Sequence, residues 1–419
     1  MIDALVTFAI RVAGAALAFA MQALLARLMT PDSYGAYVLI WTWLIAVGGV
    51  AALGLAESGV RFIPRYQARS RAGDIAGFWR FGFSVVIGAS VILCLGGLVL
   101  ARLLPEDGYV ASIAFFVAIG LPFFAMDRYL EGVARGLGWY RLTSVPVYVV
   151  RPVLIVGACA AVASATGELA LEAAGWILTV SMAAVTVGVA IVMARRLRQE
   201  HTARNGALRR RSLWMRASLP LLLVAGFEDL LTYSDLLIIG FMLPHESAAL
   251  YFAAARCMAL ANFAYYAIFF VAARRFSLAA VEEGGGDSQR VLGVTTMLTI
   301  ATTVVAVAAT LVAGPLLLAV FGEAFAAGYG VMAILGLGLV ARSLAGQAHE
   351  FLIVSGGHRQ ALAINAGAVA FNAAISILLI RALGVEGAAI GTALTMALRA
   401  AALAVVVRRD FGLRLFALS

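Results

Sequence analysis

Long apolar segments recur along this chain with only short polar connections between them. A membrane-spanning helix needs about 20 consecutive apolar residues, and twelve segments of the chain reach that length. They cover residues 6–29, 34–57, 79–101, 109–132, 143–164, 171–194, 217–242, 247–270, 290–313, 327–354, 360–380 and 386–407. Hydrophobic residues make up 63% of the chain and charged residues 13%, against about 45–50% and about 25% in soluble domains. The sequence therefore predicts an all-α polytopic membrane protein with twelve transmembrane helices.

The positive side chains indicate how these helices are oriented. All 31 Lys and Arg residues are arginine. Taken alternately, one set of connections carries 20 arginines, whereas the other carries two, or three with Arg27 at a helix end. Because positive residues stay on the cytoplasmic side, we expect both termini in the cytoplasm and the protein in a bacterial inner membrane. Arginines distributed in this way indicate membrane lipids as partners, and they do not indicate nucleic acid.

A basic stretch near the middle of the chain suggests how it is divided. Residues 195–216 hold eight arginines and one acid, Glu200, between two long apolar runs. We interpret this stretch as a cytoplasmic linker. It would join an N-terminal six-helix lobe, residues 1–194, to a C-terminal six-helix lobe, residues 217–419.

The two predicted lobes resemble each other in sequence. Pro31 aligns with Pro244 at an offset of 213 residues, and Tyr37 with Tyr251 at an offset of 214. An even number of spans gives both lobes the same orientation, so a pseudo-twofold axis along the membrane normal would relate them. A transport site is expected near the midplane between such repeats. Alternatively, the repeat reflects gene duplication and stability alone.

The chain lacks the common catalytic signatures. It has no lysine and so no Walker A loop, and His349-Glu350 fails the HExxH zinc pattern because position 353 is Ile353. The cysteines stand singly in apolar runs, as packing residues do. We expect no enzyme activity, no catalytic residue, no metal site and no cofactor, with energy supplied by an H⁺ or Na⁺ gradient or by a partner.

Several acidic residues fall inside the predicted spans, where a charge costs about 2.5–3.5 kcal/mol or more and is a functional candidate. Glu228, Asp229 and Asp235 share one span. We predict that one of them binds the coupling cation, and that Asp235 pairs with Arg256 or shares a polar cavity with it. Asp127 and Glu131, one helical turn apart near a span end, are better explained as structural.

Arginines also fall inside the spans. We predict that Arg151, Arg256, Arg342 and Arg399 line a cleft, and Arg11 is a fifth candidate that could instead pair with Glu57. Guanidinium groups suit bidentate binding of phosphate or carboxylate oxygens, so a pyrophosphate or an acidic sugar is the expected ligand. The alternative is that these residues form structural ion pairs between helices.

Four motifs resemble one family of membrane proteins. They are Arg27-Leu-Met-Thr-Pro-Asp-Ser-Tyr-Gly-Ala-Tyr37, the segment from Gly54 to Pro64, Asp235-Leu-Leu-Ile-Ile-Gly240, and Gly384-Val-Glu-Gly-Ala-Ala-Ile-Gly391. On these motifs the chain is similar to the MOP flippase superfamily, in particular to its polysaccharide-transport, Wzx-like branch. The resemblance spans nearly the whole chain, but its motifs identify the fold better than the cargo.

The resemblance implies two six-helix lobes in a V shape that alternate between the two sides of the membrane. It also implies a cargo, an oligosaccharide on a polyprenyl pyrophosphate moved from the inner to the outer leaflet, with other polysaccharide-assembly proteins as further candidate partners. Twelve spans, against fourteen in the related peptidoglycan-precursor flippases, disfavour that cargo. A MATE-like cation-coupled multidrug antiporter is the main alternative. An integral-membrane sugar polymerase or glycosyltransferase and a scaffold subunit are two further alternatives.

Overall fold

The computed structural model describes residues 2–104, 109–200, 210–262, 265, 285–413 and 415, and their regular structure is helical. The chain separates into two compact units, Met1–Asp229 (unit 1) and Leu230–Ser419 (unit 2). Eight of the described helical stretches are long and apolar enough to cross a membrane. This identifies a multi-pass membrane protein.

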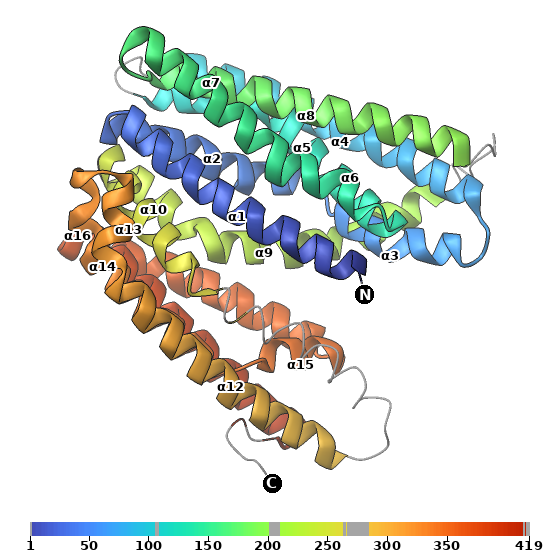
Figure 1. The fold of residues 1–419 in the computed structure, drawn as a ribbon. Coiled ribbons are helices and arrows are strands. Elements are labelled where there is room, and N and C mark those ends of the chain that lie inside the picture. Colours follow the sequence, from blue (N-terminus) through green and yellow to red (C-terminus); the bar gives the residue numbers. More distant parts are fainter. Residues whose placement is uncertain are drawn as a thin grey trace. The chain divides into compact units, whose positions relative to one another are not determined.

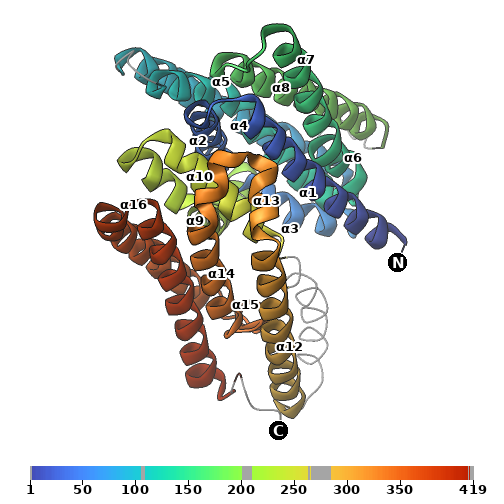
Figure 2. The ribbon, with the colours of Figure 1, turned by 60° about the vertical axis from the view of Figure 1, so that its left-hand side comes forward.

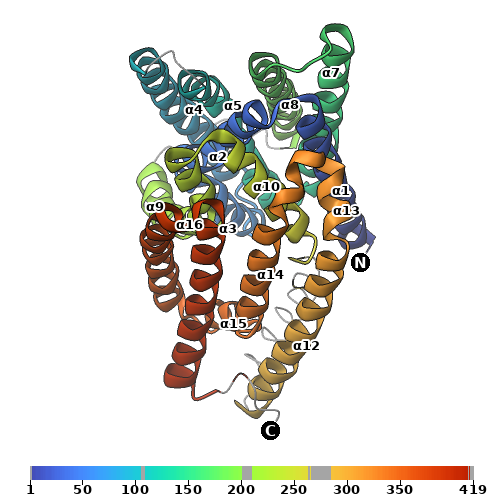
Figure 3. The ribbon, with the colours of Figure 1, turned by 90° about the vertical axis from the view of Figure 1, so that its left-hand side faces the viewer.

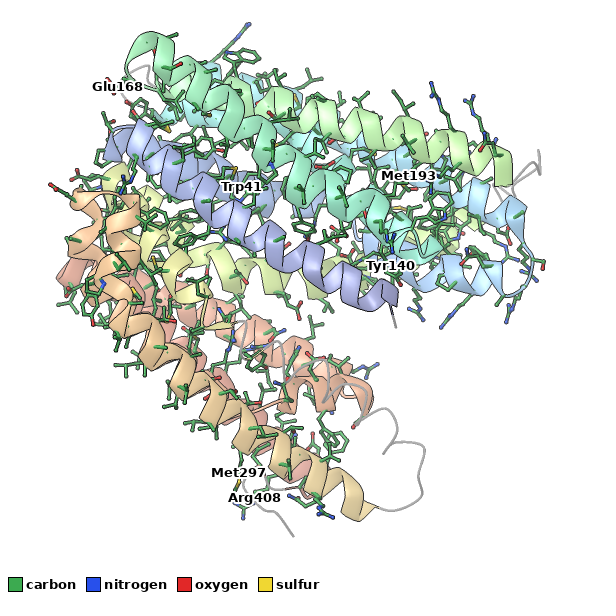
Figure 4. The ribbon with its side chains drawn as sticks, in the orientation of Figure 1. Trp41, Tyr140, Glu168, Met193, Met297 and Arg408 are labelled. Carbon is green, nitrogen blue, oxygen red and sulfur yellow. The ribbon has the colours of Figure 1, made fainter. Side chains whose placement is uncertain are left out.

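Unit 1 is a bundle of long helices organised around α5 (Figure 1). Its elements are α1 (Ile2–Leu28), α2 (Pro31–Ala51), α3 (Leu55–Gln67), α4 (Ala72–Leu103), α5 (Val110–Leu137), α6 (Tyr140–Val145), the π-helix η1 (Pro146–Val150), α7 (Arg151–Thr166) and α8 (Leu171–Glu200), with the first part of α9 (Arg211–Met242). Helix α5 contacts α2, α3, α4 and α8. Figure 4 places Tyr140 and Glu168 at opposite ends of the stretch formed by α6, η1 and α7, as a spanning segment requires.

The boundary between the two units lies inside α9, after Asp229. The first part of α9 belongs to unit 1 because its polar side chains bond there. The indole N–H of Trp214 donates to the hydroxyl of Tyr66 at 2.8 Å, and the hydroxyls of Ser58 and Ser218 lie 2.7 Å apart. Residues 201–209 of the predicted linker lie outside the described residues.

The predicted span 34–57 ends earlier, at Ala51. Leu53 and Gly54 have φ values of 52° and 67°, in the left-handed region that interrupts a helix. A Cβ atom at Gly54 would lie 2.2 Å from the carbonyl oxygen of Ser218, so only glycine permits this approach to α9. The chain then restarts as α3, whose basic side chains Arg61 and Arg65 are exposed.

Helix α3 packs closely against α5 through glycine. A Cβ atom at Gly132 would lie 2.3 Å from the carbonyl oxygen of Ala56, and one at Gly136 would lie 2.6 Å from that of Gly59. Small residues at helix contacts let backbones approach where lipid supplies no hydrophobic driving force. The α3–α5 contact fixes the position of Glu57 in unit 1.

In unit 2, α14 lies between α12 and α16 (Figures 2 and 3). The elements of this unit are the second part of α9, α10 (His245–Ala259), α12 (Gly285–Val312), α13 (Gly314–Phe321), the 3₁₀-helix η3 (Glu323–Gly328), α14 (Tyr329–Ser343), α15 (Ala348–Val354) and α16 (His358–Phe411). Residues 314–326, which lie between the predicted spans 290–313 and 327–354, form α13 and much of η3, with Leu318 and Phe321 buried.

Helix α16 is a hairpin of two arms, which match the predicted spans 360–380 and 386–407. Gly384 interrupts it with a φ of 59° and a ψ of −133°. The arms pack through glycines of the Gly384–Gly391 motif. A Cβ atom at Gly387 would lie 2.2 Å from the carbonyl oxygen of Leu379, and one at Gly391 would lie 2.5 Å from the hydroxyl of Ser376. These glycines therefore let the two arms approach each other closely.

Candidate functional site

A cavity of about 300 Å³ lies inside unit 2, with walls from α9, α10, α14 and α16. We call it the unit 2 cavity. Among the described residues, four charged side chains line it, and all four are among the sites predicted from sequence: Asp235, Arg256, Arg342 and Arg399. With every group ionised, three positive charges and one negative charge give the wall a formal charge of 3 − 1 = +2. The cavity is basic, although apolar helices build it.

Asp235 forms the acidic part of this wall and is only 7% exposed. Its carboxylate accepts hydrogen bonds from the hydroxyl of Tyr251, from the hydroxyl of Thr392 at 3.3 Å and from the backbone N–H of Leu236 at 2.8 Å. These donors stabilise a carboxylate that the surrounding apolar helices would otherwise penalise. The prediction that Asp235 and Arg256 share a polar cavity is confirmed.

A polar network extends from Asp235 along α16. Asn372, which is 1% exposed, donates from its amide nitrogen toward the hydroxyls of Thr392 at 3.5 Å and Thr395 at 3.3 Å. Its amide oxygen accepts from the hydroxyl of Ser234 at 3.0 Å. Several oxygen atoms therefore surround the carboxylate, which is the ligand type that small hard cations prefer.

The three arginines are half-buried, and each has a contact that fixes its guanidinium. The guanidinium carbon of Arg256 lies 4.5 Å from the centre of the Phe252 ring. Arg342 donates to the side-chain oxygen of Asn262 at 2.7 Å. Arg399 donates to the side-chain oxygen of Asn365 at 3.0 Å. Arg342 also stacks on the Tyr265 ring, with 4.4 Å between its guanidinium carbon and the ring centre.

Sequence reasoning missed the neutral polar residues of this site. Asn262, Asn365, Asn372 and Thr392 carry no charge, so nothing marked them among many polar residues of apolar spans. The spacing of these residues along their helices is the one signal that could have found them. Asn365 and Asn372 are seven residues apart, and so are Thr392 and Arg399, and residues at this spacing share a helix face.

Arg151 lies elsewhere, in the interior of unit 1, and is 4% exposed. It forms an ion pair with Asp127, whose carboxylate also accepts from the hydroxyl of Thr186 at 2.5 Å. Asp127 comes from α5 and Thr186 from α8, so the contact ties three helices together. This geometry agrees with the structural alternative for Arg151. The side chain of Arg11, the fifth predicted arginine, lies outside the described residues.

The other two predicted acids line a second cavity, of about 350 Å³, inside unit 1. Within the part of the chain that the structure describes, its charged residues are Glu57, Arg128, Glu131, Arg135, Glu228 and Asp229. Arg128 forms an ion pair with Asp229 at 3.0 Å, and Arg135 lies 4.0 Å from Glu131. Four acids against two arginines give this wall a formal charge of 2 − 4 = −2. The unit 1 cavity is therefore acidic.

Comparison of the sequence with protein families matches residues 2–274 to the polysaccharide biosynthesis protein family. A search of curated proteins found no match. Since the family match covers more than half of the chain, it establishes family membership.

Solved structures of transporters share the fold of this chain. The inward-facing conformation of a multidrug resistance MATE family transporter of the MOP superfamily has a TM-score of 0.76 at 15% identity, over 94% of each chain. The lipid II flippase MurJ, in an inward closed conformation, has a TM-score of 0.74 at 12% identity, over 96% of this chain and 87% of its own.

A third similar structure is a MOP superfamily transporter from Pyrococcus furiosus Vc1, described as having a binding pocket of reverse polarity. Its TM-score is 0.65 at 14% identity, over 97% of this chain and 93% of its own. At these identities the similarity establishes the fold. The chain belongs to the polysaccharide biosynthesis protein family and has the fold of MOP superfamily transporters.

Proposed function

We propose that this protein is a flippase that moves a polyprenyl-pyrophosphate-linked oligosaccharide, the repeat unit of a surface polysaccharide, across the bacterial inner membrane. The movement would occur by alternating access of a central site to the two leaflets. One observation carries the proposal: Arg256, Arg342 and Arg399 come from three helices of unit 2 and line one cavity. Family membership supports polysaccharide as the cargo class.

The chemistry of the unit 2 cavity suits an anionic head group. An isolated arginine inside a membrane protein costs at least about 2.5–3.5 kcal/mol, so three around one cavity require compensation. A pyrophosphate supplies charge-assisted hydrogen bonds to several guanidiniums at once. An uncharged glycan alone would leave these positive charges uncompensated. The pyrophosphate is therefore the part of the cargo that this cavity holds.

Asp235 is the candidate for energy coupling in this proposal. Binding of H⁺ or Na⁺ to its carboxylate would remove the negative charge from the cavity wall and change the affinity for an anion. In this proposal the hydroxyl oxygen of Thr392, 3.3 Å from the carboxylate, would be a further oxygen ligand for Na⁺. Glu228 and Asp229, in the unit 1 cavity, are alternative coupling residues.

The proposal includes a topology of twelve spans in two six-helix lobes, with both termini in the cytoplasm. The 20 arginines of alternate connections support this orientation. We propose that the protein acts by transport and not as an enzyme, and the transporters and the flippase that share its fold support this proposal.

A cation-coupled multidrug antiporter is the second candidate, and the acidic unit 1 cavity favours it. Four carboxylates there could attract a cationic drug. The two functions differ in the charge of the cargo. A flippase for the lipid-linked sugar needs the basic unit 2 cavity, whereas an antiporter for cationic drugs needs the acidic cavity of unit 1.

A proteoliposome assay would decide between them. Purified protein would be reconstituted with a fluorescent short-chain polyprenyl-pyrophosphate disaccharide, and its appearance in the outer leaflet would be followed with an impermeant quencher. The flippase proposal predicts transport that depends on Arg256, Arg342 and Arg399. Uptake of ethidium with no movement of the lipid-linked sugar would support the antiporter and reject the flippase.

A further inference from the structure

Two asparagines of unit 2 hold arginines of the cavity wall. Asn262 follows α10, and its side-chain oxygen accepts from Arg342 at 2.7 Å. Asn365, on the first arm of α16, is 2% exposed and accepts from Arg399 at 3.0 Å. In each pair an amide oxygen fixes the guanidinium, at a position where a carboxylate would be nearly isosteric.

The choice of amide over carboxylate has an electrostatic consequence. A carboxylate at either position would form an ion pair and cancel one positive charge of the cavity wall. An amide oxygen orients the same N–H groups while the charge is kept. The aromatic contacts act in the same sense, since the faces of Phe252 and Tyr265 attract a cation without neutralising it.

We propose that Asn262 and Asn365 are positioning residues that orient Arg342 and Arg399 and preserve their charge for the cargo. They thereby set the specificity of the unit 2 cavity for a multiply charged phosphate group over a neutral sugar. The inference rests on the proposed function, because it concerns the same cavity. The inference adds two residues to the site. It also gives a physical cause for the selectivity, which the arginines alone do not provide.

The test measures binding of inorganic pyrophosphate to the purified full chain in nanodiscs by isothermal titration calorimetry. The substitutions N262D and N365D each introduce a negative charge beside a guanidinium, with little change in the shape of the side chain. Each is expected to weaken pyrophosphate binding about tenfold or more, the cost of one lost charge contact. N262A and N365A remove the acceptor without adding charge and are expected to weaken binding by a smaller factor, about threefold.

The charge of the ligand separates a charge effect from a packing effect. The introduced carboxylate of N262D or N365D stays ionised beside its guanidinium, and its repulsion of the ligand grows with the ligand's negative charge. The ratio of variant to wild-type dissociation constants is therefore expected to be larger for pyrophosphate than for inorganic phosphate. A pure packing defect would change the two ratios alike.

Gln67→Glu is the control for added charge, because Gln67 is exposed on α3 in unit 1 and is expected to keep wild-type affinity. Wild-type protein that does not bind pyrophosphate would reject the proposed function itself. Pyrophosphate binding by wild type, with equal affinity in the folded aspartate variants, would overturn only the inference. Should the aspartate variants fail to fold, unchanged affinity of both alanine variants would overturn it.

Discussion

The hydroxyl of Tyr251 on α10 donates a hydrogen bond to the carboxylate of Asp235 on α9, and so joins two successive helices of unit 2 at the cavity wall. The acid therefore lies in the same cavity as three arginines and is held by its own set of donors. The affinity for the cargo and the charge state of Asp235 should therefore be linked, because the charge of the cargo and the charge of Asp235 each contribute to the electrostatic potential at the other.

Asp235→Asn tests this linkage. The change removes the negative charge from a cavity of formal charge +2, so pyrophosphate should bind roughly three- to tenfold more tightly. Transport should lose its dependence on the H⁺ or Na⁺ gradient. Calorimetry and gradient-dependent flux in proteoliposomes measure the two effects. Glu172→Gln, at an exposed acid of unit 1, is the matched control, and equal effects in both variants would rule out a local role for Asp235.

Arg256→Ala and Arg399→Ala should each reduce translocation of the lipid-linked sugar at least tenfold, because each removes a charge-assisted contact from the cavity. Arg→Lys at the same positions keeps the charge but loses the bidentate geometry, so recovery should be partial. The initial rate of translocation, at matched protein density, is the measurement. Wild-type rates in both alanine variants would remove these arginines from the site.

The buried pair of Arg151 and Asp127 should act on stability. Asp127→Asn leaves Arg151 as a buried charge without its carboxylate and is expected to cost about 3–5 kcal/mol. The double variant D127L/R151M replaces both partners with apolar groups and should recover most of that loss. Thermal unfolding in detergent measures both variants. A folded double variant that does not transport would instead return Arg151 to the list of cargo contacts.

Gly132→Ala should destabilise unit 1 by about 1–3 kcal/mol, since the added Cβ would clash with the carbonyl oxygen of Ala56. Gly88→Ala provides the matched comparison. It lies inside α4, where a Cβ meets nothing within 4 Å, so the higher helix propensity of alanine should leave stability unchanged or slightly raised. Equal melting temperatures for the two variants would argue against a tight α3–α5 contact.

Much of the fold could be predicted because membrane helices have a simple pattern. Apolar length located α4, α5 and α8, whose ends differ from the predicted spans by up to seven residues. Helix interruptions that depend on backbone conformation were missed. Leu53 and Gly54 are an example, because their positive φ values leave no trace in the hydropathy of the sequence. The boundary at Asp229 was also not predictable, since it follows from contacts such as Trp214 with Tyr66, which are distant in sequence.

The charged part of the unit 2 cavity was predictable because charge inside an apolar span is rare and expensive. Arg256, Arg342, Arg399 and Asp235 all stood out for that reason. The same criterion also selected Arg151, which the structure pairs with Asp127 in the interior of unit 1. Charge alone does not distinguish a side chain that lines a cavity from one that joins helices, because both avoid lipid in the same way.

The hairpin at Gly384 has a consequence for how such proteins diversify. One 54-residue stretch, α16, supplies Asn365, Asn372, Thr392 and Arg399 together. The turn that joins its arms is formed at Gly384, a glycine with positive φ. A single recombination between related genes could therefore exchange these polar residues of the site together, as one cassette. Chimaeras that swap this hairpin between family members offer a direct way to transfer cargo preference.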